Sequence, residues 1–210
     1  RPAGGEPEMF LKKAVIALAV VGIIAMGDAV VAVDGFINPA SWSTFDAGAN
    51  GVGADPDGFV GAVFDGRYAY FVPSYNGTAD NGEVMRYDTT GAFAAAASWV
   101  TYDPGANGVG TDSDGYYGGV FDGRYVYFVP NKVNSGEVLR YDTTGAFAVA
   151  SSWAAYDPGA NGVGTDPDGF ALGVFDGRYV YFVPHNSPAA GEVLRYDTTA
   201  AFAVASSWEA

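Results

Sequence analysis

The chain has 210 residues, with 10 Lys and Arg against 24 Asp and Glu, so its formal net charge is −14. Such a surface repels a phosphate backbone, so no nucleic acid is expected among its partners. The chain has no cysteine, which excludes a disulfide framework, a thiolate metal site and a cysteine nucleophile. Its 15% aromatic residues, 16% charged residues and 30 glycines are typical of turn-rich β proteins displayed outside the cell.

An apolar stretch covers residues 14–33, follows Lys12 and Lys13, and is broken by a single charge, Asp28. Twenty apolar residues are enough for a helix that spans a bilayer. Three interpretations stay open beside the one that we favour. The stretch fits a secretory signal peptide that starts at Met9, a membrane anchor with its lysines on the cytoplasmic side, or a β-strand donated to a neighbouring subunit.

We favour an α-helix that packs with copies of itself in the core of an extracellular filament. Short side chains recur four apart on one helical face, with a glycine close by, and let helix backbones approach: Ala17, Val21, Ala25 and Ala29, with Gly22. Asp28 would pair with a lysine or an N-terminal group of a neighbouring subunit, which removes its desolvation cost. A hydrophobic N-terminal helix before a β-rich part loosely resembles type IV pilin-like subunits.

The remaining residues repeat one sequence pattern three times. Four tryptophans mark its period of about 55 residues: Trp42, Trp99, Trp153 and Trp208. A fixed period near fifty residues indicates propeller blades or solenoid coils. We therefore divide the chain into a hydrophobic N-terminal segment, residues 1–40, and a repeat domain, residues 41–210.

Each repeat is expected to contain four β-strands. In the second copy they cover residues 118–121, 124–129, 137–141 and 153–156, and Asp122-Gly123 forms the tight turn of a hairpin. Both alternating faces of the second strand are apolar, so neighbouring sheets should cover it on both sides. A second turn is predicted over residues 142–145.

These elements resemble the kelch repeat of β-propellers, in which a hydrophobic strand and a small turn lead to a Tyr-rich strand, a Tyr-Asp segment and a Trp. The matching residues of the second copy are Phe121-Asp122-Gly123-Arg124-Tyr125-Val126-Tyr127, Tyr141-Asp142 and Trp153. Val129-Pro130 stand where that family has paired glycines. The resemblance implies a mainly β fold of three tandem four-stranded propeller-like blades, here preceded by the hydrophobic α-helix.

Three blades are fewer than the four to eight of a typical closed propeller. Residues 41–46 look like a last strand without the three that should precede it, and Trp208 begins a last strand that stops short. Unpaired strand edges invite association. We therefore expect copies of the chain as partners and name Trp42 and Trp208 as assembly residues, together with those of the N-terminal helix.

An acidic turn precedes each blade and carries two carboxylates spaced by one residue: Asp55 and Asp57, Asp112 and Asp114, Asp166 and Asp168. The pattern resembles half of a calcium loop, to which Asn107 or Asn161 would add an oxygen. Calcium takes six to eight oxygens, and few are evident locally. The alternative is an Asx-rich turn that needs no ion. Calcium is the one candidate cofactor.

Other candidate residues have plainer interpretations. His185, the single histidine, is expected to be an exposed loop residue, and Asn76-Gly77-Thr78 is a candidate glycosylation acceptor. Glycoside hydrolysis also uses carboxylate pairs, but threefold repetition of the same aspartates favours turns over an asymmetric active site.

Arginines that share a strand face with aspartates predict ion pairs or hydrogen bonds that stabilise the blades: Arg86 with Asp88, Arg140 with Asp142, and Arg195 with Asp197.

These observations predict a non-enzymatic structural subunit of an extracellular filament or surface layer. It would assemble through the hydrophobic N-terminal segment and the incomplete blade edges. Before assembly, the chain would contact a membrane. The alternative is a membrane-anchored β-propeller binding module that recognises carbohydrate, with glycans stacked on exposed tyrosines.

Overall fold

The computed structural model describes residues 38–133, 135–185 and 191–210. The chain divides into two units with a boundary between Thr44 and Phe45, and each is described by itself. The predicted N-terminal helix lies outside the described residues, with Ala17, Val21, Gly22, Ala25, Asp28 and Ala29. Among the described residues, no helix is long and apolar enough to cross a membrane.

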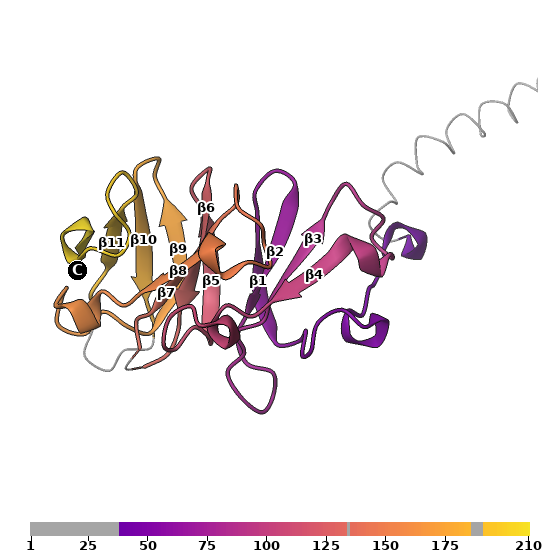
Figure 1. The fold of residues 1–210 in the computed structure, drawn as a ribbon, viewed down its shortest axis with the longest axis horizontal. Helices are drawn as coiled ribbons and strands as arrows, with labels where there is room; N and C mark the ends of the chain where they lie inside the picture. The colour runs from indigo at the N-terminus through magenta and orange to yellow at the C-terminus, as the bar shows by residue number, and fades with distance from the viewer. Residues whose placement is uncertain (1–37, 134, 186–190) are drawn as a thin grey trace, which may run out of the picture. The chain divides into compact units, whose positions relative to one another are not determined.

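Residues from Phe45 onward form three four-stranded antiparallel sheets in tandem, which follow one another along the chain in Figure 1. The first blade contains β1 (Phe59–Phe64), β2 (Tyr68–Pro73), β3 (Val84–Asp88) and β4 (Trp99–Tyr102). The second contains β5 (Tyr116–Phe121), β6 (Tyr125–Pro130), β7 (Val138–Asp142) and β8 (Trp153–Tyr156). The third contains β9 (Phe170–Phe175), β10 (Tyr179–Pro184), β11 (Leu194–Asp197) and β12 (Trp208–Glu209).

The helical elements among the described residues are single 3₁₀ turns. They are η1 (Pro39–Ser41), η2 (Gly48–Asn50), η3 (Ala96–Ser98), η4 (Gly105–Asn107), η5 (Ala150–Ser152), η6 (Gly159–Asn161) and η7 (Ala205–Ser207). The turns η3, η5 and η7 lie in the Ala-rich link between the third and fourth strands of each blade. There the indole N–H of the following tryptophan donates to a carbonyl of the link, as Trp153 does to Phe147 at 2.7 Å.

The predicted propeller-like blades are confirmed. The four strands expected in the second copy agree with β5 to β8 within two residues at each end. The hairpin turn between β5 and β6 forms because Gly123 adopts φ 103°, a left-handed conformation that favours glycine. The Asp122 carboxylate accepts the backbone N–H groups of Arg124 and Tyr125, which fixes the same turn.

The blades pack against one another through apolar faces. We call the side of a blade that contacts the following blade its forward face, and the side that contacts the preceding blade its rear face. The forward face of the first blade comprises Val63, Tyr70, Val72 and Val84. The rear face of the second blade comprises Tyr116, Phe128, Leu139, Tyr141, Phe147 and Trp153. The second and third blades pack in the same way.

The Tyr-rich strand β6 is covered on both faces, as predicted. Val126 and Phe128 belong to the core between the first and second blades, whereas Tyr127 and Val129 belong to the core between the second and third. All four side chains are fully buried. This double burial explains why the strand lacks the polar and apolar alternation of a half-exposed sheet.

The last strand predicted over residues 41–46 is absent from the described structure, where residues 39–41 form η1 and residues 42–46 belong to no strand. A fourth strand needs a third strand as hydrogen-bonding partner, and the described residues hold none before it. Trp42 is exposed, whereas Trp208 begins β12 and is buried against Tyr196 and Phe182. Trp208 is therefore a core residue of the third blade.

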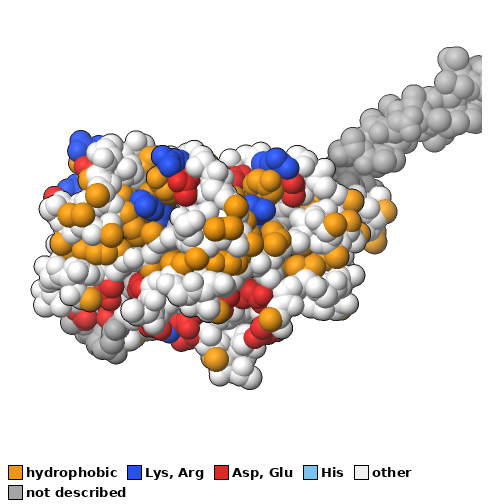
Figure 2. All heavy atoms as spheres, viewed as in Figure 1, with side chains coloured by type: hydrophobic (Ala, Val, Ile, Leu, Met, Phe, Trp, Pro, Cys, Tyr) orange, Lys and Arg blue, Asp and Glu red, His pale blue; other side chains and the backbone are white. Residues whose placement is uncertain are grey.

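Charged side chains are segregated on the face of the blade array drawn in Figure 2. Lys and Arg side chains gather along its upper edge, most Asp and Glu side chains lie toward its lower edge, and hydrophobic side chains form a band between them. The acidic excess of the chain is therefore concentrated on one side of this face.

Candidate functional site

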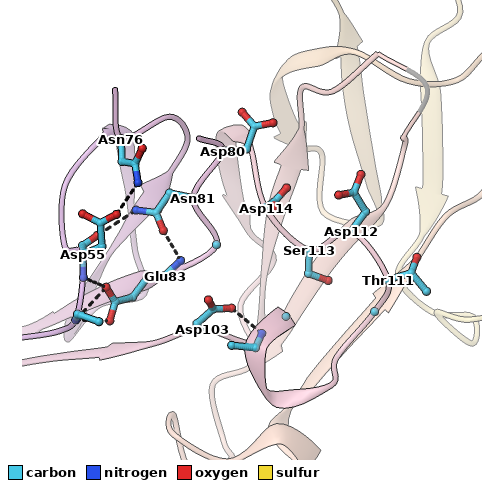
Figure 3. Close-up of a pocket in the computed structure, with 15 residues that line it drawn as sticks. Asp55, Asn76, Asp80, Asn81, Glu83, Asp103, Thr111, Asp112, Ser113 and Asp114 are labelled. Atoms are coloured by element: carbon cyan, nitrogen blue, oxygen red, sulfur yellow. Dashed lines mark hydrogen bonds between the residues drawn. The ribbon is translucent and has the colours of Figure 1, made fainter. Parts of the chain in front are cut away.

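A polar hollow of about 510 Å³ lies between the first blade and the loop that leads into the second (Figure 3). Its lining includes six carboxylates: Asp55, Asp80, Glu83, Asp103, Asp112 and Asp114. It therefore gathers two of the predicted acidic turns, those that precede the first and second blades. The turn that precedes the third blade contributes Asp166 and Asp168 to a separate hollow of about 230 Å³.

A glutamate holds each acidic turn in place. The Glu137 carboxylate accepts the backbone N–H groups of Thr111 and Asp112, with distances of 2.8 Å for the closest contacts. Glu83 and Glu192 make the same bonds to the first and third turns. Sequence reasoning missed this role, although its signal was visible as a Gly-Glu pair before the third strand of every blade.

The first turn is also held by the Asn81 side chain, whose amide donates to the carbonyl oxygens of Asp55 and Asp57 (Figure 3). Its amide oxygen accepts the backbone N–H of Glu83 at 2.8 Å. Asn81 and Glu83 thus form one connected clamp. The turn is an Asx-rich loop fixed by side chains from the segment before β3.

Lys132 forms ion pairs with both aspartates of the second acidic turn. Its ammonium nitrogen lies 2.5 Å from the Asp112 carboxylate, contacts Asp114 and lies 3.7 Å from Asp80. Burial alone would raise the pKa of Asp112, but hydrogen bonds from Lys132 and Ser135 outweigh it and hold that pKa below its usual value. Conversely, the carboxylates outweigh the effect of burial on Lys132 and raise its pKa.

The three aspartate pairs therefore have different surroundings. Asp55 and Asp57 are exposed, Asp112 and Asp114 share Lys132, and Asp168 is buried. Within residues 38–133, 135–185 and 191–210, no three His, Asp or Glu side chains come together as a metal-binding group. Calcium binding by these turns stays a prediction, which calorimetric titration of the chain with CaCl₂ would test.

The candidate glycosylation residue, Asn76, is half-buried in the loop between β2 and β3. Its amide nitrogen donates to Asp55, and its oxygen accepts the backbone N–H groups of Thr78 and Ala79 (Figure 3). The nitrogen that a glycan would modify is thus engaged in the first acidic turn. Glycosylation at this position stays a prediction.

The ion pairs of the blades differ from those expected. Asp142 pairs with Arg124 of the preceding hairpin turn at 2.7 Å, rather than with Arg140. The same arrangement joins Asp88 to Arg67 and Asp197 to Arg178. The prediction of the partner was wrong because the antiparallel register places the start of the second strand opposite the end of the third.

The strand arginines instead stabilise the junctions between blades. The Arg86 guanidinium lies over the Phe147 ring of the second blade, 4.4 Å from its centroid. Arg140 lies in the same way over Phe202 of the third blade, at 4.2 Å. Such cation–π contacts add to the apolar packing of each junction. The third equivalent, Arg195, pairs with Glu209 of its own blade.

A second hollow, of about 590 Å³, has exposed aromatic rings in its wall. Tyr75 and Tyr117 line it together with polar side chains, among them Asn131 and Lys132. The ring of His185 lies parallel to Tyr117, with 6.0 Å between centroids, and His185 is exposed as predicted. Exposed rings beside amide, carboxylate and ammonium groups offer both stacking and hydrogen bonding.

No family model matches this chain, and no curated protein sequence is significantly similar to it.

Proposed function

We propose that the chain is a non-enzymatic structural subunit that assembles with copies of itself into an extracellular filament or surface layer. One observation carries the proposal: the forward face of the last blade exposes Val174, Val183 and Val193, and the partly buried rear face of the first blade exposes Phe93. Monomeric soluble proteins rarely expose contiguous apolar patches of this kind, which mark interaction sites.

Two further features support the proposal. The aspartates and arginines that recur in every copy make the same structural contacts three times, as with Asp88, Asp142 and Asp197. The hydrophobic stretch of residues 14–33, which the sequence predicts to be a pilin-like helix, would add a second surface for self-association. The kelch-like repeat supplies the rigid body of the subunit.

Electron microscopy of the purified full-length chain tests the proposal. We expect filaments or sheets with a long-range repeat in material shed from cells and in the concentrated protein. A monodisperse monomer under the same conditions would contradict it.

The hollow of Tyr75 and Tyr117 favours a second candidate function, a membrane-anchored binding module for carbohydrate. Rings that are 54% and 43% exposed in the wall of a hollow are placed to stack on sugar faces. Screening the chain on a glycan array would test it. Binding that Tyr117→Ala abolishes and Val149→Arg leaves unchanged is the expected result, and the absence of any glycan signal would refute it.

A further inference from the structure

The two ends of the blade array carry the two halves of one interface. The forward face of the third blade, Val174, Tyr181, Val183 and Val193, corresponds by position to that of the first and second blades. The rear face of the first blade, Phe59, Phe71, Met85, Tyr87, Phe93 and Trp99, corresponds to those of the second and third. Each half has the apolar and aromatic chemistry that its counterpart meets inside the chain.

The forward face of the third blade is more exposed than the forward faces of the first two blades. The forward-face valines of the first two blades are at most 8% exposed: Val63, Val72 and Val84, then Val120, Val129 and Val138. Their equivalents in the third blade, Val174, Val183 and Val193, are 56%, 44% and 49% exposed. The following blade covers these valines in the first two blades, and the described residues include no following blade that would cover those of the third.

The rear face of the first blade shows the complementary change. Phe93 is 37% exposed, whereas its equivalents Phe147 and Phe202 are each 4% exposed. An apolar hollow of about 420 Å³ opens on this face, lined by Phe59, Phe71, Met85, Phe93 and Trp99 among others. At the internal junctions, aromatic and valine side chains of the preceding blade fill this space, as Tyr70 does against Tyr141 and Phe147.

We infer that a second copy of this chain occupies these faces, with the third blade of one copy docked on the first blade of the next. This inference rests on the proposed self-assembly and gives its contact surface and direction. The contact is heterologous, because a forward face meets a rear face rather than itself. Such contacts close into a ring when the rotation between copies allows it and otherwise form a filament.

Docking would give Arg195 and Tyr181 the aromatic contacts that their equivalents in the first two blades make with the following blade. Arg195 of one copy takes the place of Arg86 and Arg140, which lie over Phe147 and Phe202. Its target in the next copy is the equivalent ring, Phe93. Tyr181 likewise takes the place of Tyr70 and Tyr127, which pack against Tyr141 and Tyr196 of the following blade.

Part of the rear face is already complete. The Phe45 ring stacks on Trp99, with 4.8 Å between centroids, as Tyr102 does on Trp153 and Tyr156 on Trp208. Phe45 thus supplies the contact that the last strand of a preceding blade makes at the internal junctions. The second copy has to fill only the region nearer the inner strands, where β1, β5 and β9 follow one another.

Two residues of the end faces add side-chain atoms that the internal junctions lack, so a joint between copies has to be wider than those junctions. Ala62 stands where the later blades have Gly119 and Gly173, and a Cβ at those glycines would lie 2.4 and 2.6 Å from Val63 and Val120. Leu172 stands where the earlier blades have glycine. The first of these, Gly61, has open space around a Cβ, so the first junction has room for a side-chain atom at this position.

Cysteine cross-linking tests the docking directly, because the natural chain contains no cysteine. Full-length Ala62→Cys and Val174→Cys chains, distinguished by mass, are mixed and oxidised. We expect a 1:1 disulfide-linked product that joins the two variants. Val183→Cys provides a second forward-face partner for Ala62→Cys, since Val72 and Val129 lie 3.4 Å from a Cβ at Gly119 and Gly173.

The control partner is Val149→Cys, which is 47% exposed and belongs to neither face. Yields of the 62–174 and 62–183 products several-fold above that of the 62–149 product support the inference, and equal yields overturn it. If the yields are equal and the chain still forms filaments, assembly uses another surface and the proposed function stands. If the specific product forms without filaments or layers, the docking stands and the proposed function fails.

Discussion

At the scale of single residues, each acidic turn depends on one glutamate. Glu137 is buried and accepts the N–H groups of Thr111 and Asp112, whereas Glu192 is half-buried and makes the same bonds in the third blade. We expect Glu137→Ala to destabilise the fold by about 1–3 kcal/mol, since buried donors lose their acceptor. Glu192→Ala should cost less, because water reaches the donors that it frees. Urea unfolding of both variants measures the difference, and equal losses would contradict it.

The arginine–aspartate pairs make the free energy of unfolding depend on pH in the acidic range. The hydrogen bond from Arg124 lowers the pKa of Asp142 to about 2. An unfolded aspartate has a pKa of about 3.9, so the unfolded state binds more protons between these values. The contribution of the pair is therefore complete above about pH 4 and is lost as the pH falls through about 2.

Asp142→Asn tests this dependence. The variant should be less stable than the natural chain at pH 7, and the two stabilities should converge as the pH falls below the pKa of the folded carboxyl. Urea unfolding between pH 7 and the acid limit of folding gives both curves. Curves that stay parallel throughout would show that the pair contributes nothing through its charge.

At the scale of elements, the inner strands are spaced by glycine. A Cβ on Gly119 of β5 would lie 2.4 Å from Val63, which is buried in the junction with the first blade. We expect Gly119→Ala to destabilise the chain by about 1–3 kcal/mol, as overpacking of a core does. Gly61→Ala in β1 is the matched control, because a Cβ there meets nothing within 4 Å.

Thermal unfolding of the two glycine variants distinguishes an effect of the spacing between neighbouring blades from an effect of the strand propensity of alanine. Alanine is favoured over glycine inside a strand by roughly 0.5–1 kcal/mol, so Gly61→Ala should be neutral or stabilising. Opposite shifts in the melting temperature of the two variants support the spacing argument. A loss of similar size in both would assign the effect to the strands themselves.

The strands and their burial could be predicted because local chemistry determines them. The Asp122-Gly123 turn and the apolar faces of β6 fix a hairpin and its neighbours without information from the rest of the chain. The ion pairs could not be read in the same way, since the partner of Asp142 depends on the register between β6 and β7. The glutamate clamps were missed because Glu137 reaches a turn 25 residues earlier in the chain.

In the acidic hollow too, only part of the arrangement could be predicted from the sequence. Its repeated aspartates were interpreted either as calcium ligands or as parts of turns, and Asp112 and Asp114 both contact Lys132. Lys132 has no counterpart in the pattern that the three copies share, so repetition alone could not place its ammonium group between Asp112 and Asp114. A contact that occurs in only one of the three copies cannot be predicted from the repeated pattern and becomes visible only in the folded structure.

At the scale of the whole molecule, stability follows from contacts between neighbouring blades. Two of the three described core clusters are each shared between one forward face and one rear face, as in other repeat proteins whose units contact only their neighbours. The third blade contributes its buried rear face but leaves its forward face exposed. A docked copy would therefore stabilise the third blade of one chain and the first blade of the next.

Docking between folded copies should make apparent stability depend on concentration. A partner that binds only the folded chain stabilises it by about 2.7 kcal/mol at a hundredfold excess over Kd. We expect the melting temperature of the natural chain to rise as its concentration rises. In Val174→Arg, a charged side chain interrupts the forward face and should abolish the rise, whereas Val149→Arg should retain it. A melting temperature of the natural chain that is independent of concentration would contradict docking through these faces.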